Sequence, residues 1–461
     1  MTIAKPCFLV GIGGSGMMPL AMILRARGVE VLGSDRGLDR GQISAKFDAL
    51  RAAGITLFPQ DGSGVREGQR VIASAAVEDI VPDIIVARTL GCERATRAEA
   101  LAGLFNNAAL PIGVAGTSGK STVTGMIAWI LHATGRDPTV MNGAVMKNFA
   151  RADAPFASAL VGAGAAFVSE VDESDRSIRL YRPAIAVLNN VSLDHMALDE
   201  LRALFGDFAG RARHVVANAG DIETRALLAG LPSLTTFAVE DDADLSARAL
   251  VPERFAIRFD LVTKGATIPV RLAVPGRHNV SNALAAIGAA VAAGVPLADA
   301  AAACEGFVGL KRRFELVGEA RRVAVIDDFA HNPDKIAATL STLHAFPGRL
   351  LLLFQPHGYG PLKVMRDALV ATFTEHLAAD DLLVMPDPVY QGGTVSREVG
   401  SEDIVEAIGG RARYVANREA AATMLAAEAR AGDRIVVMGA RDDTLSALAG
   451  GILDALRGGA K

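Results

Sequence analysis

The stretch GVAGTSGKSTVTGM, residues 113–126, decides how the middle of this chain folds. It follows an apolar run typical of a buried strand and leads into a sequence typical of a helix. Gly116 and Gly119 let backbone N–H groups approach a phosphate, Lys120 adds a cation, and the Ser121 hydroxyl can ligate Mg²⁺. A strict Walker A loop would carry glycine at 114, where this chain has valine, so the loop is a variant. The pattern predicts a binding loop for ATP made by Gly116, Thr117, Ser118, Gly119, Lys120, Ser121 and Thr122.

A second glycine loop, GIGGSG, occupies residues 11–16. It also joins an apolar run to a helical stretch, and Asp35 closes the next apolar run. Glycines at these places let N–H groups meet a diphosphate, while a carboxylate can accept hydrogen bonds from ribose hydroxyls. The pattern predicts a nucleotide-diphosphate site at Gly13, Gly14, Ser15, Gly16 and Asp35, with a purely structural turn as the alternative. It does not separate NAD from a UDP-sugar.

Apolar runs of strand length alternate with alanine-rich helical stretches along the whole chain, which is typical of α/β units on largely parallel sheets. We therefore predict an α/β protein with three domains. They are a Rossmann-like domain over 1–106, a P-loop ATPase-like domain with a parallel sheet over 107–311, and a second Rossmann-like domain over 312–461. The runs fall at 7–13, 29–35, 70–75 and 84–87; at 110–116, 165–174 and 184–190; and at 323–329, 349–356, 380–386 and 433–439.

The composition narrows the class of protein. The chain has 461 residues, 51% apolar and 21% charged, and its 47 Lys and Arg nearly balance its 51 Asp and Glu. This excludes a disordered chain and argues against a nucleic-acid partner held by bulk positive charge. The longest uncharged run, 279–298, contains Asn, Pro and Gly, which favours a buried helix over a membrane span. The start of the sequence has no signal-peptide pattern and the three cysteines are scattered, so we expect a cytoplasmic protein.

Acidic and histidine side chains follow two of the central apolar runs. Glu170, Asp172, Glu173 and Asp175 end the run 165–174, where carboxylates could hold Mg²⁺ beside the ATP loop. A solvated acidic turn is the alternative. The run 184–190 is followed by three further candidates, one of which is a histidine. A lone histidine is more often structural than a ligand, and imidazole prefers softer metals than Mg²⁺. These candidates are Asn190, Asp194 and His195.

Other candidates lie nearer the C-terminus. Asn279 and Asn282 share a helix face and could either meet an adenine edge or cap the helix. Arg313, in a basic pair, could contact a phosphate or be an ordinary surface residue. Loops that follow strands commonly carry ligand contacts. In such loops stand Asp328 and His331, then His357, Tyr359 and Lys363, and finally Gly439 and Arg441.

Taken in order, these motifs resemble the Mur ligase family over essentially the whole chain. The ordered set is GIGGSGM, GTSGKST, EVDES, NNVSLDH, GRHNVSN, KRRFE, DDFAHNP and FQPH. The resemblance is closest to the branch that joins UDP-N-acetylmuramate to L-alanine and to the related murein peptide ligases. It implies an ATP-dependent ligase of peptidoglycan synthesis. The carboxylate of a UDP-N-acetylmuramate-type substrate would be converted to an acyl phosphate, which the amine of an amino acid or peptide attacks, releasing ADP and phosphate.

The resemblance also implies roles for matching residues. Lys120 would hold the triphosphate, and Ser121, Glu173 and His195 would ligate Mg²⁺ ions. On the ATP side, Asn279 and Asn282 would meet adenine, Arg313 the phosphates and Asp328 the ribose. His331 would face the acceptor and act in catalysis. The remaining substrate contacts would be Gly13, Gly14, Ser15, Gly16 and Asp35 for the UDP part, with Asn190, His357 and Tyr359.

Departures from the family pattern leave several points open. Gly358 and Pro361 stand where the alanine-adding branch usually has two arginines after Gln-Pro-His, so L-alanine, a muropeptide and another amine all remain possible acceptors. The segments 57–64 and 74–84 lack the expected pattern, so the identity of the sugar nucleotide is open too. The helix 198–213 has no lysine, so we predict no carbamate. A non-catalytic nucleotide-binding relative is one alternative class. An oxidoreductase that uses the loop 11–16 is another, and the ATP loop at 113–126 argues against it. We expect small-molecule partners, neither nucleic acid nor membrane, and a monomer or homodimer.

Overall fold

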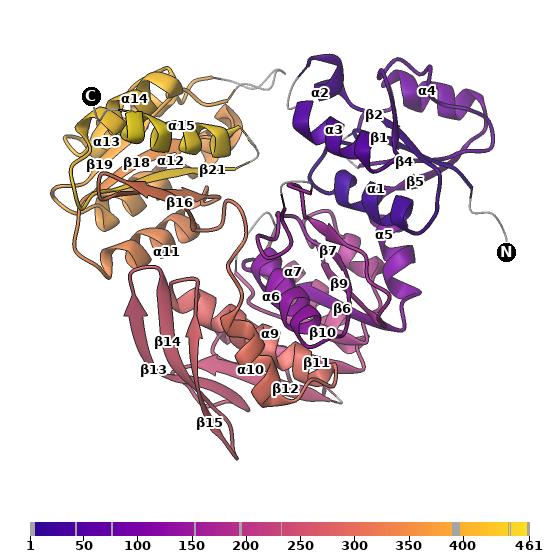
Figure 1. The fold of residues 1–461 in the computed structure, drawn as a ribbon, viewed down its shortest axis with the longest axis horizontal. Coiled ribbons are helices and arrows are strands. Elements are labelled where there is room, and N and C mark those ends of the chain that lie inside the picture. Colours follow the sequence, from indigo (N-terminus) through magenta and orange to yellow (C-terminus); the bar gives the residue numbers. More distant parts are fainter. Residues whose placement is uncertain are drawn as a thin grey trace. The chain divides into compact units, whose positions relative to one another are not determined.

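The computed structural model describes residues 5–41, 44–74, 77–151, 154–192, 196–231, 233–389, 397–440, 442 and 444–458. These residues form three sheets that follow one another along the chain, each with its own helices (Figure 1). The chain divides into two compact units, one of which comprises Pro252–Ile257, Val274–His278 and Gly309–Lys461. Within the described ranges, no helix is both long enough and apolar enough to cross a membrane.

The N-terminal sheet has five parallel strands in the order β3-β2-β1-β4-β5, as predicted for a Rossmann-like domain. The strand predicted at 84–87 is wrong, because these residues lie in helix α4 (Pro82–Thr89). Ile84 and Ala87 are buried three residues apart, which suits one face of a helix. The other elements are β1 (Cys7–Val10), α1 (Met17–Ala26), β2 (Val31–Ser34), α2 (Arg36–Asp39), α3 (Ser44–Ala52), β3 (Thr56–Phe58), β4 (Arg70–Ala73), β5 (Glu93–Thr96) and α5 (Arg97–Asn106).

The central sheet has ten strands in the order β15-β14-β13-β12-β11-β10-β6-β9-β7-β8. Strand β6 (Leu110–Ala115) lies between β9 (Ala166–Glu170) and β10 (Ile185–Leu188), and both pairings are parallel. The carboxyl ends of these three strands therefore meet at one edge of the sheet, where the ATP loop and the acidic motif begin. The strand runs at 110–116, 165–174 and 184–190 are confirmed.

The remaining central elements include a strand extension, β11–β15, that the sequence did not reveal. They are α6 (Lys120–Ala133), β7 (Thr139–Met141), β8 (Ala159–Leu160), η1 (Ser177–Leu180), α7 (Leu198–Gly210), β11 (His214–Asn218), α8 (Ile222–Ala226), β12 (Leu234–Val239), β13 (Leu245–Glu253), β14 (Ala256–Val262), β15 (Thr267–Leu272), α9 (Arg277–Ala292) and α10 (Leu297–Glu305).

The C-terminal sheet has six strands in the order β16-β17-β21-β18-β19-β20, and only the pair of β16 with β17 is antiparallel. Leu350 and Leu352 pack on one face of β18 under α11, α12 and α13, whereas Leu351 and Leu353 pack on the other under α14 and α15. Burial on both faces explains the continuous apolar run. The elements are β16 (Glu315–Ala320), β17 (Val323–Asp328), α11 (Pro333–His344), β18 (Leu350–Gln355), α12 (Tyr359–His376), β19 (Leu382–Met385), α13 (Ser401–Ile408), β20 (Ala412–Tyr414), α14 (Arg418–Glu428), β21 (Arg434–Gly439) and α15 (Leu445–Gly458).

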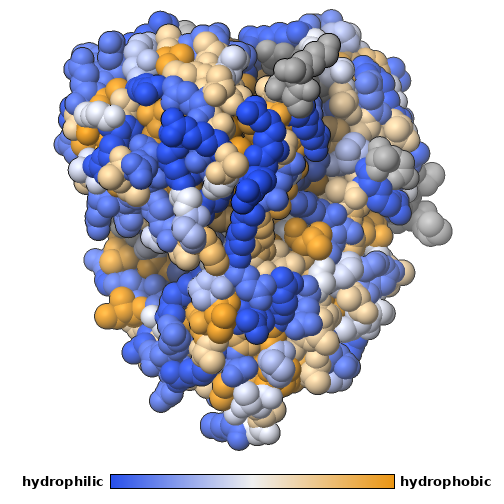
Figure 2. All heavy atoms as spheres, turned by 60° about the vertical axis from the view of Figure 1, so that its left-hand side comes forward, coloured by the Kyte–Doolittle hydropathy of each residue, from blue (hydrophilic) through white to orange (hydrophobic). Residues whose placement is uncertain are grey.

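Polar side chains dominate the face of the molecule that Figure 2 draws. Figure 2 shows hydrophilic residues over most of one face, with apolar residues in small scattered groups. Large apolar residues that are strongly exposed, such as Ile80, Ile222 and Val364, are far apart in the sequence. Single exposed apolar residues are ordinary on globular proteins, so these carry no functional weight.

Candidate active site

The ATP loop between β6 and α6 takes a conformation that needs glycine. Gly116 and Gly119 have φ values of 139° and 84°, in the left-handed region that side chains disfavour. A Cβ atom on Gly119 would lie 2.4 Å from Asn189 Nδ2 and 2.5 Å from Asn282 Oδ1. The loop is therefore enclosed by amide side chains, and there is no room for a larger residue at 119.

Asparagine side chains after β10 hold the loop in place. Asn190 Oδ1 accepts from the Ser118 N–H at 2.8 Å, and Asn190 Nδ2 donates to the Ser118 carbonyl oxygen at 3.1 Å. The Thr117 N–H donates to the Asn190 carbonyl oxygen, and the Thr117 hydroxyl bonds both backbone groups of Ser192. The Asn190 amide thus has loop partners in this structure, and its predicted substrate contact stays a prediction.

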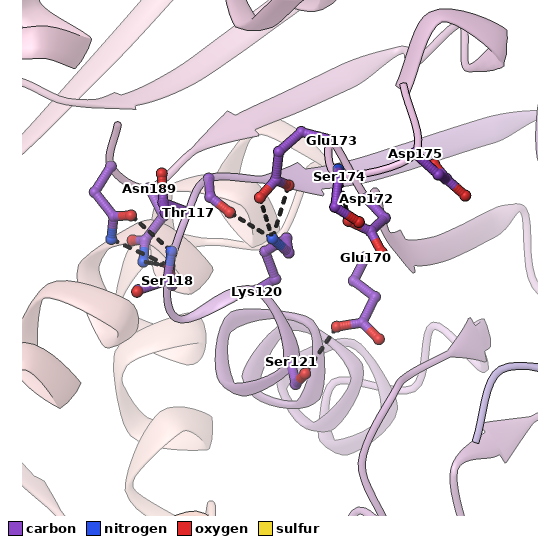
Figure 3. A network of polar contacts seen from close by, with 12 residues as sticks. Thr117, Ser118, Lys120, Ser121, Glu170, Asp172, Glu173, Ser174, Asp175 and Asn189 are labelled. Carbon is purple, nitrogen blue, oxygen red and sulfur yellow. Dashed lines mark hydrogen bonds and ion pairs between the residues drawn. The ribbon is translucent and has the colours of Figure 1, made fainter. Parts of the chain in front are cut away.

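Lys120 and Glu173 form a shielded ion pair at the start of α6 (Figure 3). Lys120 Nζ donates to the Gly116 carbonyl oxygen at 2.8 Å and to the two Glu173 carboxylate oxygens at 2.7 and 3.0 Å. The Glu173 side chain is 5% exposed, and this burial raises its pKa, although Lys120 acts in the opposite direction. The pair brings together two of the predicted catalytic residues beside the loop amides, at the place where phosphate oxygens are expected.

The neighbouring acids divide into two kinds. Asp172 and Asp175 accept hydrogen bonds from the N–H groups of Ser174 and Ser177, so they stabilise the local turn. Burial acts to raise the pKa of Asp172, but the Lys120 charge and the Ser174 hydrogen bonds outweigh it, and that pKa is lowered. These two acids fit the structural alternative better than a metal site.

Glu170 is one of the four acids predicted beside the ATP loop, although the family resemblance gave it no role. The Ser121 hydroxyl donates to Glu170 Oε2 at 2.7 Å, and the two side chains face each other in Figure 3. A Cβ atom on Gly143 would lie 2.1 Å from Glu170 Oε1, so the glycine leaves space for this carboxylate. The signal was present in the sequence, since Glu170 is the last residue of β9.

Oxygen donors that suit Mg²⁺ are gathered at this edge: the Ser121 hydroxyl and the Glu170 and Glu173 carboxylates. No group of three or more His, Cys, Asp or Glu side chains arranged to hold a metal occurs among the residues that the structure describes. The predicted metal ligand His195 and its neighbour Asp194 lie outside those residues. Thr122 lies in the first turn of α6 and is half-buried.

The asparagines of α9 reach the ATP loop. Asn282 Nδ2 donates to Asn279 Oδ1 at 3.1 Å, and Asn282 Oδ1 accepts from Asn189 Nδ2 at 3.0 Å. Asn279 and Asn282 are 6% and 4% exposed and lie inside the helix, which begins at Arg277. Asn189 Oδ1 is buried with no hydrogen-bond partner among the described residues. This arrangement disfavours helix capping and leaves amide groups next to the phosphate loop, as adenine recognition would need.

The N-terminal glycine loop is tied to Asp35. The Gly13 N–H donates to Asp35 Oδ2 at 2.8 Å, and the Gly37 N–H donates to Asp35 Oδ1 at 2.7 Å. Lys46 Nζ donates to the Gly13 carbonyl oxygen at 3.0 Å. Gly14 and Ser15 are exposed, and Gly16 precedes α1, where a Cβ atom would lie 3.0 Å from the Arg97 side chain. Asp35 therefore shapes the loop, and its ribose contact stays a prediction.

In the C-terminal unit, Arg312 is buried and Arg313, the predicted phosphate contact, is half-buried. Arg312 donates to the carbonyl oxygens of Gly439 and Asp442 at 2.7 and 2.8 Å and lies 3.4 Å from Asp327. Asp327 is fully buried, and burial raises its pKa to about 6. The Arg313 guanidinium lies over the Phe329 ring at 4.2 Å. Arg313 thus has an aromatic contact, and its phosphate role stays a prediction.

The predicted ribose contact Asp328 is also held by its own unit. Its Oδ1 accepts from the Phe314 N–H at 3.0 Å, and its Oδ2 accepts from the Thr339 hydroxyl at 2.5 Å. Asp328 is 8% exposed at the end of β17. Both oxygens of this carboxylate therefore accept structural hydrogen bonds, and its predicted ribose contact stays a prediction.

Two predicted acceptor residues meet in the C-terminal unit. The rings of His331 and His357 are 5.3 Å apart and perpendicular. His331 Nδ1 lies 2.9 Å from the Phe329 carbonyl oxygen, so this nitrogen carries the proton and donates it. Burial, aided by Lys335, lowers the pKa of His331 to about 3. His331 is therefore a neutral imidazole at neutral pH. Tyr359 begins α12, and the Arg397 guanidinium lies 5.7 Å from its ring centre.

His331 gives a testable pH dependence of stability. Its pKa is about 3 when folded against an ordinary 6.5, so the unfolded chain binds the extra proton between these values. The contribution of His331 to the free energy of unfolding is therefore complete above pH 6.5 and is lost as the pH falls towards 3. When the pH falls from about 6.5 to 5.5, the free energy of unfolding of the C-terminal unit should decrease by about 1 kcal/mol more in the native chain than in His331→Asn. Calorimetry measures this decrease. His132→Asn, at an exposed position, is the control; equal losses in all three proteins would contradict the buried neutral state.

Comparisons with known proteins agree with this arrangement. Residues 8–108 match the model of the Mur ligase family, catalytic domain; residues 114–290 match the Mur ligase middle domain; and residues 312–441 match the Mur ligase, glutamate ligase domain. A UDP-N-acetylmuramate--L-alanine ligase from Streptomyces coelicolor is 37% identical over 457 residues, which are 95% of this chain and 95% of that protein.

Two solved structures are similar over nearly the whole chain. A UDP-N-acetylmuramate-alanine ligase from Thermotoga maritima has a TM-score of 0.80 and 25% identity, covering 98% of this chain and 99% of that one. A murein peptide ligase from Psychrobacter arcticus has a TM-score of 0.70 and 26% identity, with the same coverage. Since all three family models match in order and full-length relatives exceed 30% identity, the chain belongs to the Mur ligase family.

Proposed function

We propose that this chain is an ATP-dependent ligase that joins the lactyl carboxylate of UDP-N-acetylmuramate to the amine of an amino acid, releasing ADP and phosphate. The observation that carries the proposal is the Lys120–Glu173 ion pair at the glycine loop, which hydrogen bonds from the Asn190 side chain hold in place. Full-length relatives named as UDP-N-acetylmuramate--L-alanine ligases support the choice of substrates. Because the proposed reaction consumes ATP, we infer that the protein acts in the cytoplasm.

The loop would bind the triphosphate with its N–H groups. Lys120 would turn from Glu173 to the β and γ oxygens, which leaves the Glu173 carboxylate available as a ligand. Mg²⁺, bound by Ser121, Glu173 and Glu170, would neutralise charge on the triphosphate. A free carboxylate is a poor acyl donor, so the lactyl carboxylate would first attack the γ-phosphorus. The bond from that phosphorus to the β–γ bridging oxygen breaks, ADP leaves, and an acyl phosphate results. The amine then attacks the acyl carbon, and phosphate leaves from the tetrahedral intermediate.

The acceptor amine must lose a proton before or during its attack. The low pKa of His331 keeps its imidazole neutral but also makes it a weak base, so His331 would orient the amine through Nε2 rather than take its proton. The departing phosphate would carry that proton away. Its neighbour His357 and the Tyr359 hydroxyl would help to define the acceptor pocket. These roles, like those of Asn279, Asn282, Arg313 and Asp328 towards ATP, are part of the proposal.

We propose L-alanine as the acceptor, although Gly358 and Pro361 replace the expected arginines. The test is phosphate release with ATP, Mg²⁺ and UDP-N-acetylmuramate, offered L-alanine, other free amino acids or a muramyl-type tripeptide. We expect kcat/KM for L-alanine to exceed that for the tripeptide by about tenfold or more, because a pocket shaped for one small residue rejects a larger one. Preference for the tripeptide would reassign the acceptor. Absence of turnover with every acceptor, in a chain that still binds ATP, would overturn the ligase proposal.

A further inference from the structure

A cavity of about 280 Å³ lies in the C-terminal unit, away from the predicted site residues. It is lined by Arg254, Glu319, Arg322, Phe346, Pro347, Gly432 and Arg434. Arg322 directly precedes β17 and Arg434 begins β21, so the cavity lies at the amino ends of these parallel strands. Asp328 ends β17 and Gly439 ends β21, so the predicted ATP contacts lie at the opposite edge, about 17–20 Å away along the strands.

The lining carries excess positive charge. Three arginines face one carboxylate, and only Arg254 pairs with it, at 3.0 Å from Glu319. The backbone of Arg322 accepts a hydrogen bond from the Gly432 N–H. Its guanidinium is exposed and makes no hydrogen bond or ion pair within the described part of the chain. The Arg322 guanidinium is thus available to donate hydrogen bonds to a ligand in the cavity, whereas Arg254 is paired with Glu319.

Arg434 adds a buried charge that forms no ion pair with a carboxylate among the described residues. It is 3% exposed, and its two Nη atoms donate to the carbonyl oxygens of Leu343, Phe346 and Gly348. Its Nε is buried without a hydrogen-bond partner among the described residues. Burial lowers the pKa of Arg434, and the nearby Arg254 charge acts in the same direction.

Asp381 and Asp433 act on Arg434 without forming an ion pair with it, and each of them is bonded to another residue. Asp433 pairs with Arg349 at 2.7 Å, and Asp381 bonds His344 at 2.8 Å. A buried charge without a counter-ion is costly, so an anion in the cavity would be stabilised by Arg434.

We propose that this cavity is a binding site for the oxyanion group of a small ligand, a phosphate or a carboxylate. Arg254 and Arg322 would donate charge-assisted hydrogen bonds to the anion, while Arg434 supplies positive charge from the cavity wall. Phe346 and Pro347 form an apolar side that would contact the non-ionic part of the ligand. Glu319 competes with the ligand for Arg254. The site is independent of the proposed ligase reaction.

The test is calorimetric titration of the full chain with inorganic phosphate and, separately, with acetate at constant ionic strength. Phosphate that binds the glycine loops is common to all variants, so differences between them report the cavity. We expect Arg322→Gln and Arg254→Gln to weaken binding of one anion by about threefold or more, since each removes a charged donor. Glu319→Gln should strengthen it by about threefold, because it frees Arg254.

Arg457→Gln is the matched control, since Arg457 is exposed in the same unit and pairs with Asp454, one helical turn away. It should leave both affinities unchanged. Circular dichroism checks folding, and the buried Arg434 is left intact for that reason. If phosphate binds more tightly than acetate, the natural ligand of the cavity carries a phosphate group. If acetate binds more tightly, that ligand carries a carboxylate. The proposal is overturned if all three cavity variants bind both anions within threefold of the native chain.

Discussion

Lys120→Ala is expected to lower ATP-dependent phosphate release by about 10³-fold or more, because it removes a cation bonded to the backbone of the ATP loop. Phosphate release is measured with saturating ATP, Mg²⁺, UDP-N-acetylmuramate and L-alanine. Lys264→Ala is the matched control, because Lys264 is an exposed lysine outside the loop. Retention of more than about a tenth of the native rate in Lys120→Ala would remove this loop from the chemistry.

The substitution has a structural side effect that must be separated from the chemical one. Lys120→Ala leaves the buried Glu173 carboxylate without its partner, which destabilises the fold or forces protonation. The double variant Lys120→Ala with Glu173→Gln removes both charges and should recover most of the lost thermal stability. It should remain inactive, because it lacks both the Lys120 contact with phosphate and the Glu173 carboxylate proposed to bind Mg²⁺. Recovery of activity in the double variant would show that Lys120 matters only for folding.

Much of the fold could be predicted because parallel strands buried on both faces leave continuous apolar runs. The run 349–356 is one case, since alternate leucines pack under different helices. The prediction failed at 84–87, where a short apolar run has no period that separates strand from helix. It also missed β13–β15, whose residues alternate between buried and exposed positions and include charged side chains.

The candidate site was predictable as a set of loops, but not in its contacts. Adjacent arginines at 312 and 313 look alike in sequence, and a positive φ of 59° at Arg312 is part of the turn in which its side chain is buried. Similarly, Glu170 and Glu173 are both strand-end acids, and only the structure pairs one with Ser121 and the other with Lys120. Such differences depend on tertiary packing, which spacing along the chain does not encode.

The second large effect is expected for Gly119→Ala, which should weaken ATP binding by about 10²-fold and lower stability by about 2–4 kcal/mol. Part of the stability loss, about 1 kcal/mol, comes from placing a side chain at a φ of 84°. The rest comes from the new Cβ atom, which would overlap Asn189 Nδ2 and Asn282 Oδ1 and push apart the amides that enclose the loop. Calorimetric titration with an ATP analogue gives the affinity, and thermal unfolding gives the stability.

Gly135→Ala separates these two causes. Gly135 follows the same helix, α6, and has a φ of 73°. A Cβ atom on Gly135 would have no described atom within 4 Å beyond its chain neighbours. The variant therefore carries the backbone strain without the overlap, and it should lose about 1 kcal/mol of stability while binding the ATP analogue normally. The two glycines flank one helix and have similar positive φ values. The difference in stability and ATP affinity between their variants therefore measures the effect of overlap with Asn189 and Asn282. Equal affinities in Gly119→Ala and Gly135→Ala would mean that Asn189 and Asn282 do not shape the nucleotide site.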